Sequence, residues 1–200
     1  MNILVKNRNG HEVVPLDSRL MMDRKVFLEG EIDALAAVEF TKKMLQLNSE
    51  STELPIDLLI NSCGGEINSG MLIYDVLQDS KAPVRVYCMG AAYSMAAVIF
   101  ASGKNGRYML PHSALMLHEP LISRGVGGNA TSIKSISDSL METRSKINQI
   151  LAKHTGRTEA EIEEATRFDH FFSPEESIAF GLCDEVAGFS SLLASENDTL

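Results

Sequence analysis

Strand-like and helix-like hydrophobic patterns alternate along the first half of the chain. Short apolar runs of strand length recur three times, and each is followed by a turn and then by apolar residues at helical spacing. The predicted strands are Lys25 to Leu28, Ile56 to Ile60 and Val84 to Met89. The predicted helices begin at Asp33, Ile67 and Ser94. Strands that alternate with helices over short turns predict an α/β fold with a mainly parallel sheet and flanking helices.

Two glycine positions are expected to end strands. Ser62 to Gly65 is predicted to be a turn, and Gly90 is predicted to break the third strand. Further short strands are expected at about Arg107 to Leu110 and Ala114 to Leu117. Functional sites of parallel sheets gather at the carboxyl ends of the strands. Gly65 and Ser94 both fall at such ends.

A long helical pattern follows a glycine-rich stretch and runs from about Ala130 to Lys153, where Gly156 closes it. At 1.5 Å per residue it would be roughly 36 Å long, against a radius of gyration of about 16 Å for a compact domain of this size. The helix is therefore expected to project, and its apolar row would need a second chain for burial. The alternative is a helix that lies flat on its own core. The row consists of Ile133, Ile136, Leu140, Ile147 and Leu151.

Two capping boxes are predicted in the last third of the chain. Thr158 pairs with Glu161, and Ser173 pairs with Glu176, three residues on in each case. Pro174 adds a residue that favours the first helical position. Each box predicts the start of a helix.

Composition indicates one folded domain. The chain of 200 residues has no linker-like segment, so we expect a single domain over residues 18–190, with an N-terminal arm at 1–17 and a tail at 191–200. A net charge of −9 disfavours nucleic acid and anionic membranes as partners. Three cysteines without CxxC spacing argue against a disulfide framework and a zinc site. With no signal peptide or membrane span evident, we expect a soluble cytoplasmic protein without metal or cofactor.

Ser94 is the first candidate for chemistry. It follows a strand and a glycine turn and opens a helix, a placement that exposes its hydroxyl and directs backbone N–H groups towards nearby negative charge. A serine in this position can be a nucleophile. It can equally be only the N-cap of its helix.

His118 and Asp169 are the candidates for a base and its carboxylate partner. His118 ends a predicted strand, and Asp169 lies in an aromatic run where a buried carboxylate would need a partner. The alternatives are a hydrogen-bonded core histidine and an aspartate that caps the following turn. Gly64 and Gly65 could offer N–H groups beside that of Met95 as an oxyanion hole. Chain order proves nothing, because unrelated folds arrange such triads differently.

Three segments together resemble the Clp protease proteolytic subunit, with the same order and spacing over about residues 18–186. They are Ile60-Asn61-Ser62-Cys63-Gly64-Gly65, Met89-Gly90-Ala91-Ala92-Tyr93-Ser94-Met95-Ala96-Ala97 and Leu110-Pro111-His112-Ser113-Ala114-Leu115-Met116-Leu117-His118-Glu119-Pro120. The resemblance implies a crotonase-like fold with a handle helix at about 130–154. It also implies a nucleophile at Ser94, a base at His118, an orienting carboxylate at Asp169 and an oxyanion hole at Gly65 and Met95.

The resemblance further implies an assembly and its partners. Seven-membered rings stack into a tetradecamer that encloses the sites, and an AAA+ Clp ATPase feeds unfolded polypeptides through the axial pore. The implied activity is that of a serine endopeptidase. The alternatives are a catalytically weak or structural subunit of a hetero-oligomeric Clp complex and, from another class, a crotonase that acts on acyl-CoA.

Several positions depart from the family pattern. The family usually has proline at Cys63, a small residue at Tyr93 and a ring-interface arginine at Phe168. Asp57 and Leu59 stand where the family tends to have aromatic residues of the ATPase-docking pocket, and the loop from Ile122 to Gly128 is slightly longer than usual. These differences indicate a divergent second paralogue that forms rings with a related Clp subunit.

Overall fold

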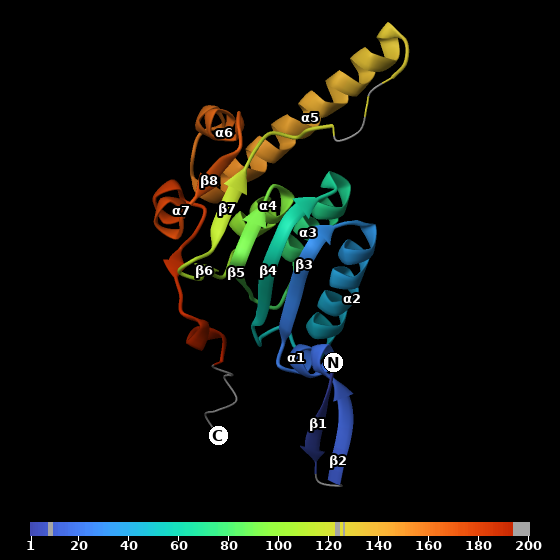
Figure 1. The fold of residues 1–200 in the computed structure, drawn as a ribbon, viewed down its shortest axis with the longest axis vertical. Coiled ribbons are helices and arrows are strands. Elements are labelled where there is room, and N and C mark those ends of the chain that lie inside the picture. Colours follow the sequence, from blue (N-terminus) through green and yellow to red (C-terminus); the bar gives the residue numbers. More distant parts are fainter. Residues whose placement is uncertain (8–9, 123–124, 126, 194–200) are drawn as a thin grey trace.

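The computed structural model describes residues 1–7, 10–122, 125 and 127–193. A sheet of seven strands forms its centre (Figure 1), and the order β3-β4-β5-β6-β9 is parallel throughout. The strands are β3 (Lys25–Ile32), β4 (Ile56–Gly65), β5 (Val84–Tyr93), β6 (Arg107–Met109), β7 (Ala114–Leu117), β8 (His170–Phe172) and β9 (Glu185–Val186). The predicted α/β class with a mainly parallel sheet is confirmed.

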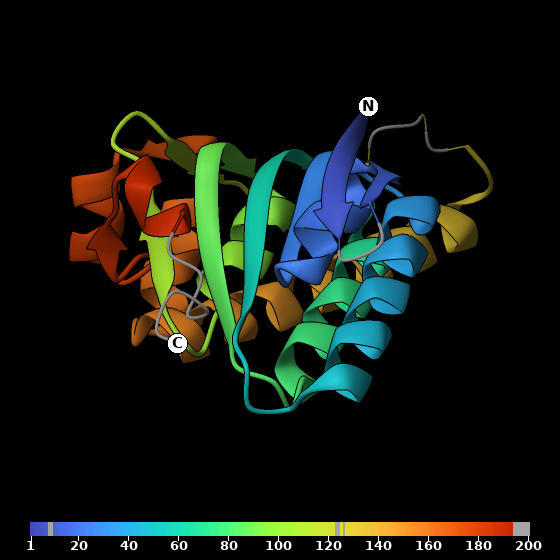
Figure 2. The same ribbon diagram turned by 90° about the horizontal axis from the view of Figure 1, so that it is seen from below.

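Helices connect and cover these strands. They are α1 (Leu16–Met22), α2 (Ala34–Glu50), α3 (Ile67–Asp79), α4 (Met95–Ala101), α5 (Ala130–Thr155), α6 (Glu159–Thr166) and α7 (Pro174–Phe180), and a 3₁₀ turn follows at Phe189–Leu192. Figure 2 shows α2 and α3 side by side on one face of the sheet. The cap at Asp33 is confirmed, since its side chain accepts a hydrogen bond from Ala36 N. Both predicted capping boxes are confirmed as well.

Strand alternation divides the apolar residues between the two faces of the sheet. Leu58 and Ile60 face the main core under the helices, whereas Leu59 between them faces the other side. There Leu59 and Tyr87 are buried under Leu192, which belongs to the C-terminal 3₁₀ turn. Phe27, Met89 and Tyr108 pack against this second cluster.

Two predicted strand ends were wrong. β4 continues through the expected turn to Gly65, with a shift of register between Ile60 and Ser62. β5 continues through Gly90 to Tyr93. The reason is a change of partner: β5 pairs with β6 before Gly90 and with β7 after it, and the φ of +143° at Gly90 permits the bend.

The N-terminal residues form structure that the hydrophobic pattern did not indicate. β1 (Asn2–Asn7) and β2 (Gly10–Pro15) pair in antiparallel fashion and lead into α1. The hairpin extends away from the sheet at the end opposite to α5 (Figure 1). The seven residues at the end of the predicted tail, 194–200, lie outside the described part of the chain.

The long helix α5 leaves the body of the molecule, as its predicted length required (Figure 1). It spans 26 residues, begins at the cap Asn129 and ends at Gly156, whose φ is +73°. Its apolar row divides in two, because Ile147 and Leu151 are buried on the chain's own core whereas Ile133 and Ile136 are 47% and 39% exposed. The inner half therefore packs on this chain and the outer half remains uncovered by it.

The last turn of α5 contains a histidine that is neutral at physiological pH. His154 Nε2 lies 3.2 Å from Tyr74 Oη, and burial, aided by Lys153 and Arg107, lowers the pKa of His154 to about 4. The unfolded chain binds this proton near pH 6.5, whereas the folded chain does not bind it until about pH 4. The burial of neutral His154 is therefore fully compatible with folding above pH 6.5. As the pH falls towards 4, the unfolded chain gains a proton that the folded chain does not bind, and the free energy of unfolding decreases.

We expect this histidine to contribute to acid sensitivity. His154→Gln keeps a polar side chain near Tyr74 but removes the titration, so its melting temperature should fall by a few degrees less than that of the wild type between pH 7 and pH 4.5. Calorimetry of both proteins across this range measures the difference. Parallel pH profiles would contradict the assignment.

Candidate active site

Ser94 lies in the sharp connection between β5 and α4. Its φ of +54° and ψ of −126° are unusual for a residue with a side chain, and such strain concentrates at functional sites. Its backbone N–H donates to Met116 O at 2.8 Å, which ties the connection to β7. The Ser94 side chain makes no capping hydrogen bond to α4. A role only as helix cap therefore does not account for this hydroxyl.

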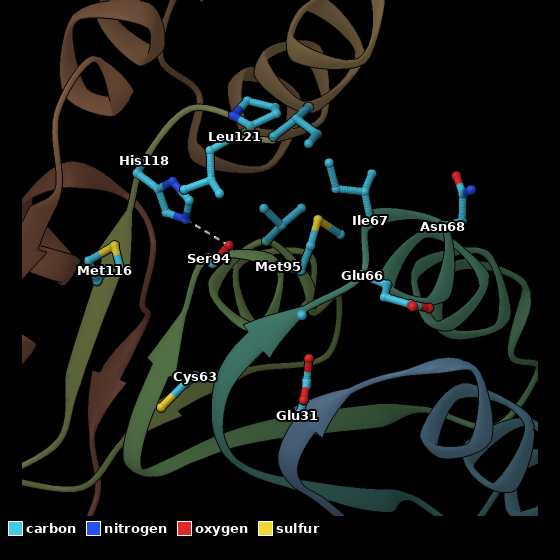
Figure 3. Close-up of a pocket in the computed structure, with 14 residues that line it drawn as sticks. Glu31, Cys63, Glu66, Ile67, Asn68, Ser94, Met95, Met116, His118 and Leu121 are labelled. Atoms are coloured by element: carbon cyan, nitrogen blue, oxygen red, sulfur yellow. Dashed lines mark hydrogen bonds between the residues drawn. The ribbon is translucent and has the colours of Figure 1, made fainter. Parts of the chain in front are cut away.

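His118 meets Ser94 across the top of two neighbouring strands. β5 and β7 are parallel and in register at Tyr93 and Met116, so the residues that follow, Ser94 and His118, emerge at the same end of the sheet. His118 Nε2 lies 2.8 Å from Ser94 Oγ (Figure 3). With Nε2 as the acceptor, the imidazole is placed to remove the hydroxyl proton.

Asp169 lies opposite His118, just beyond the last residue pair of β7 and β8, but the two side chains are not hydrogen-bonded to each other. The antiparallel register of β7 and β8 pairs Leu117 with His170, which brings His118 and Asp169 to adjacent ends. In the part of the chain that the structure describes, no hydrogen bond or ion pair links the two side chains. The expectation that Asp169 is buried among aromatic residues was wrong. β8 is a short edge strand that buries Phe172, while Asp169, Phe168 and Phe171 are exposed.

Gly64, the first residue of the glycine pair in β4, lies directly against Ser94. A Cβ atom on Gly64 would be 2.6 Å from Tyr93 O and 2.7 Å from Ser94 Cβ. Gly64 also has a φ of +90°, and its N–H donates to Ser62 Oγ at 3.0 Å. Only a residue without a side chain permits this approach. Gly65 and Met95 line the same cleft as Ser94, and their amides could stabilise an oxyanion there.

The cleft around Ser94 has a volume of about 700 Å³. Its apolar lining comes from α3, α4, α5, β7 and the segment after β7, and includes Ile67, Met95, Val98, Met116, Pro120, Leu121 and Ile147. Glu31, Glu66 and Asn68 supply a polar side (Figure 3). A cleft of this kind can hold an apolar side chain beside the nucleophile. Sequence reasoning assigned no pocket residues, since helical apolar positions look the same whether they line a cleft or a core.

Two departures from the family pattern lie next to the nucleophile. Cys63 is exposed and lines the cleft, so its thiol borders the site. The ring of Tyr93 packs edge-on against Phe171, with their centroids 5.6 Å apart. Tyr93 thereby joins β5 to the edge strand β8, which precedes the last helix and follows Asp169.

The departures at Phe168 and Asp57 lie outside the cleft. Phe168 is 76% exposed, and the Arg167 guanidinium lies over its ring at 5.7 Å. Asp57 is buried and forms an ion pair with Arg85 at 2.7 Å. The slightly longer loop from Ile122 to Gly128 is only partly within the described residues, since 123, 124 and 126 lie outside them.

The chain matches the sequence model of a known protein family. The family model for Clp protease matches residues 8–189, which is nearly the whole chain. The matched region includes Ser94, His118, Asp169 and the glycine pair of β4. Among the described residues, no helix combines the length and the apolar character needed to cross a membrane.

Proposed function

The chain belongs to the Clp protease family, and from this we propose that it is a serine endopeptidase subunit in which Ser94 is the nucleophile and His118 the general base. The observation that carries the proposal is the 2.8 Å hydrogen bond between His118 Nε2 and Ser94 Oγ. The strained backbone at Ser94 and the adjacent cleft support the same assignment.

The reaction follows from these positions. Ser94 Oγ attacks the peptide carbonyl carbon while His118 Nε2 takes the hydroxyl proton. The N–H groups of Gly65 and Met95 stabilise the oxyanion of the tetrahedral intermediate. His118 then gives the proton to the leaving amine, and a water molecule activated by the same imidazole hydrolyses the acyl-enzyme. No cofactor or metal is needed for these steps.

Asp169 is proposed to orient His118 and to stabilise its protonated form. The strand register supports this role because it brings the two residues to adjacent ends of β7 and β8. The exposed carboxylate would have to turn towards His118 Nδ1 for the purpose. We propose that assembly with neighbouring subunits brings about this turn, since residues 167–169 are uncovered in the single chain.

Covalent labelling tests the function. A fluorophosphonate probe should react once per subunit, and peptide mass mapping should locate the adduct on Ser94. His118→Ala should abolish labelling, because the hydroxyl then has no base. A crotonase acting on acyl-CoA would need no such serine and would not be labelled. Absence of the adduct from a folded, assembled preparation would rule out an active serine peptidase.

The second candidate is a catalytically weak or structural subunit of a mixed Clp ring. The separation of Asp169 from His118 in the single chain favours this candidate. It predicts slow labelling of the isolated protein and faster labelling when the partner subunit is added.

We propose that the assembly is a stacked pair of rings, built in part by the exposed outer half of α5. The substrates are unfolded polypeptides delivered by an AAA+ Clp ATPase, and the subunit is one of two paralogues. The three free cysteines are compatible with a reducing cytoplasm. The net charge of −9 disfavours nucleic acid as a substrate.

The exposed Phe168 leads to an expectation about assembly. An aromatic residue cannot form the ionic contact that an arginine would form at a ring interface, so the protein alone should assemble poorly and cleave peptides slowly. Sedimentation velocity and a peptidase assay on one sample, with and without a paralogous subunit, measure both properties. A stable, fully active tetradecamer of this chain alone would exclude the two-paralogue proposal.

A further inference from the structure

The segment that carries His118 is held immediately after the histidine. Glu119 follows β7, and its backbone N–H donates to Thr166 O, at the last residue of α6, at 2.7 Å. The Glu119 carboxylate Oε2 lies 3.0 Å from Arg144 Nε on α5. α5 and α6 therefore hold Glu119, one residue after the proposed base. β7 has already ended at this point, so no strand pairing holds the segment there.

Arg144 connects more than one element. Its guanidinium NH2 also contacts the carboxylate of Glu163 in α6. The Arg144 side chain is 20% exposed, so water screens these attractions less than it screens an ordinary surface pair. Arg144 Nε–H makes no hydrogen bond with any residue that the structure describes. Its attraction to Glu119 is therefore coulombic and depends mainly on the charge.

Arg144 lies on α5 between the exposed outer half of the helix and the inner half that is buried on this chain. On the outer side of this point Met141 is 54% exposed, and on the inner side Ile147 is buried and lines the cleft. A change in the position of the outer half of α5 can therefore move Arg144, which contacts Glu119 in the segment that carries His118.

We infer that Arg144 is a positioning residue for the reaction. Through Glu119 it holds the end of β7 so that His118 Nε2 stays on Ser94 Oγ, and through Glu163 it aligns α6, which leads to Asp169. Displacing a reacting group by about 1 Å can lower the rate by up to about 100-fold. The inference rests on the proposed peptidase function.

Replacing the charge tests the positioning role. Arg144→Met keeps an unbranched apolar stem but removes the guanidinium and leaves Glu119 without this cation, and should lower kcat by about 10- to 100-fold with less than about a threefold change in KM. Glu119→Gln, which is isosteric, should give a loss of kcat of the same kind. It also serves as the second variant if Arg144→Met does not fold. Arg144→Lys should recover part of kcat, because the contact with Glu119 is coulombic.

The control is Lys42→Met. It removes a cation from an exposed ion pair on α2, where Lys42 pairs with Glu39 away from the cleft, and should leave kcat unchanged. Wild-type kcat in Arg144→Met, or an equal loss in Lys42→Met, would overturn the inference.

A second measurement separates this inference from the proposed function. Hydrogen exchange should be faster at the Glu119 amide in Arg144→Met than in the wild type or in Lys42→Met, whether or not the protein cleaves peptides. If the wild type is inactive but the exchange difference is present, the peptidase function is refuted and the positioning role of Arg144 stands. If the wild type is active and the exchange difference is absent, only the positioning role of Arg144 is refuted.

Discussion

Ser94→Ala is expected to lower the rate of peptide cleavage by at least about 10⁴-fold, because it removes the attacking atom itself. His118→Ala should be about as damaging, since its Nε2 accepts from Ser94 Oγ and the two groups act as a unit. Asp169→Asn should retain more activity, as its carboxylate is exposed and not bonded to His118 in the single chain. Steady-state kinetics on assembled protein measure all three.

Two controls make this result specific. His112→Ala changes an exposed histidine in the turn before β7 and should leave the rate unchanged. Ser94→Gly should be inactive yet at least as stable as the wild type, because glycine relieves the positive φ at this residue. Cleavage by Ser94→Ala at the wild-type rate, or a larger loss in His112→Ala than in His118→Ala, would refute the assignment.

Gly64→Ala should remove activity and also destabilise the fold. The new methyl group would lie 2.6 Å from Tyr93 O and 2.7 Å from Ser94 Cβ, at a residue whose φ is +90°. The first contact is with backbone, so relief requires β5 and the nucleophile to move. We expect a loss of at least about 100-fold in kcat/KM and of about 3 kcal/mol or more in the free energy of unfolding.

Gly156→Ala is the matched comparison for Gly64→Ala. Gly156 also has a positive φ, +73°, but an added Cβ would meet no atom within 4 Å. It should cost only the backbone strain, about 1 to 2 kcal/mol, and leave kcat/KM unchanged. Urea unfolding and peptidase kinetics distinguish the two variants. Equal effects would mean that the close approach of Gly64 to Ser94 is of no consequence.

The sequence predicted the elements that local pattern determines. The apolar residues of α2 recur at helical spacing, and the four that were predicted to share one face are buried on it: Ala37, Phe40, Met44 and Leu47. Side-chain caps such as Asp33 could also be predicted from the sequence, because they depend on residues within one turn of each other. Ser94 and His118 were predicted as a pair from the resemblance, and the parallel register of β5 and β7 brings them together.

Features that depend on distant segments were missed. Gly90 marks a change of strand partner rather than a strand end, and which partner a strand takes is set by β6 and β7 far along the chain. The exposure of Asp169 depends on β8 being the edge strand, and no local pattern shows that. No local pattern indicates the contact of Arg144 with Glu119, because Glu119 is 25 positions earlier in the sequence.

The change of partner in β5 has a consequence for how activity can be lost. Ser94 follows β5 and His118 follows β7, and these strands are joined over the pairs Ala91 to Tyr93 and Ala114 to Met116. The hydrogen bond between His118 and Ser94 therefore spans the boundary between β5 and the strands β7 and β8 at the edge of the sheet. A slight separation of β7 from β5 would abolish the proposed peptidase activity while the core under α2, α3 and α4 stayed folded. Thermal stability and catalytic competence are thus separable properties of this chain, and an inactive preparation can melt at the same temperature as an active one.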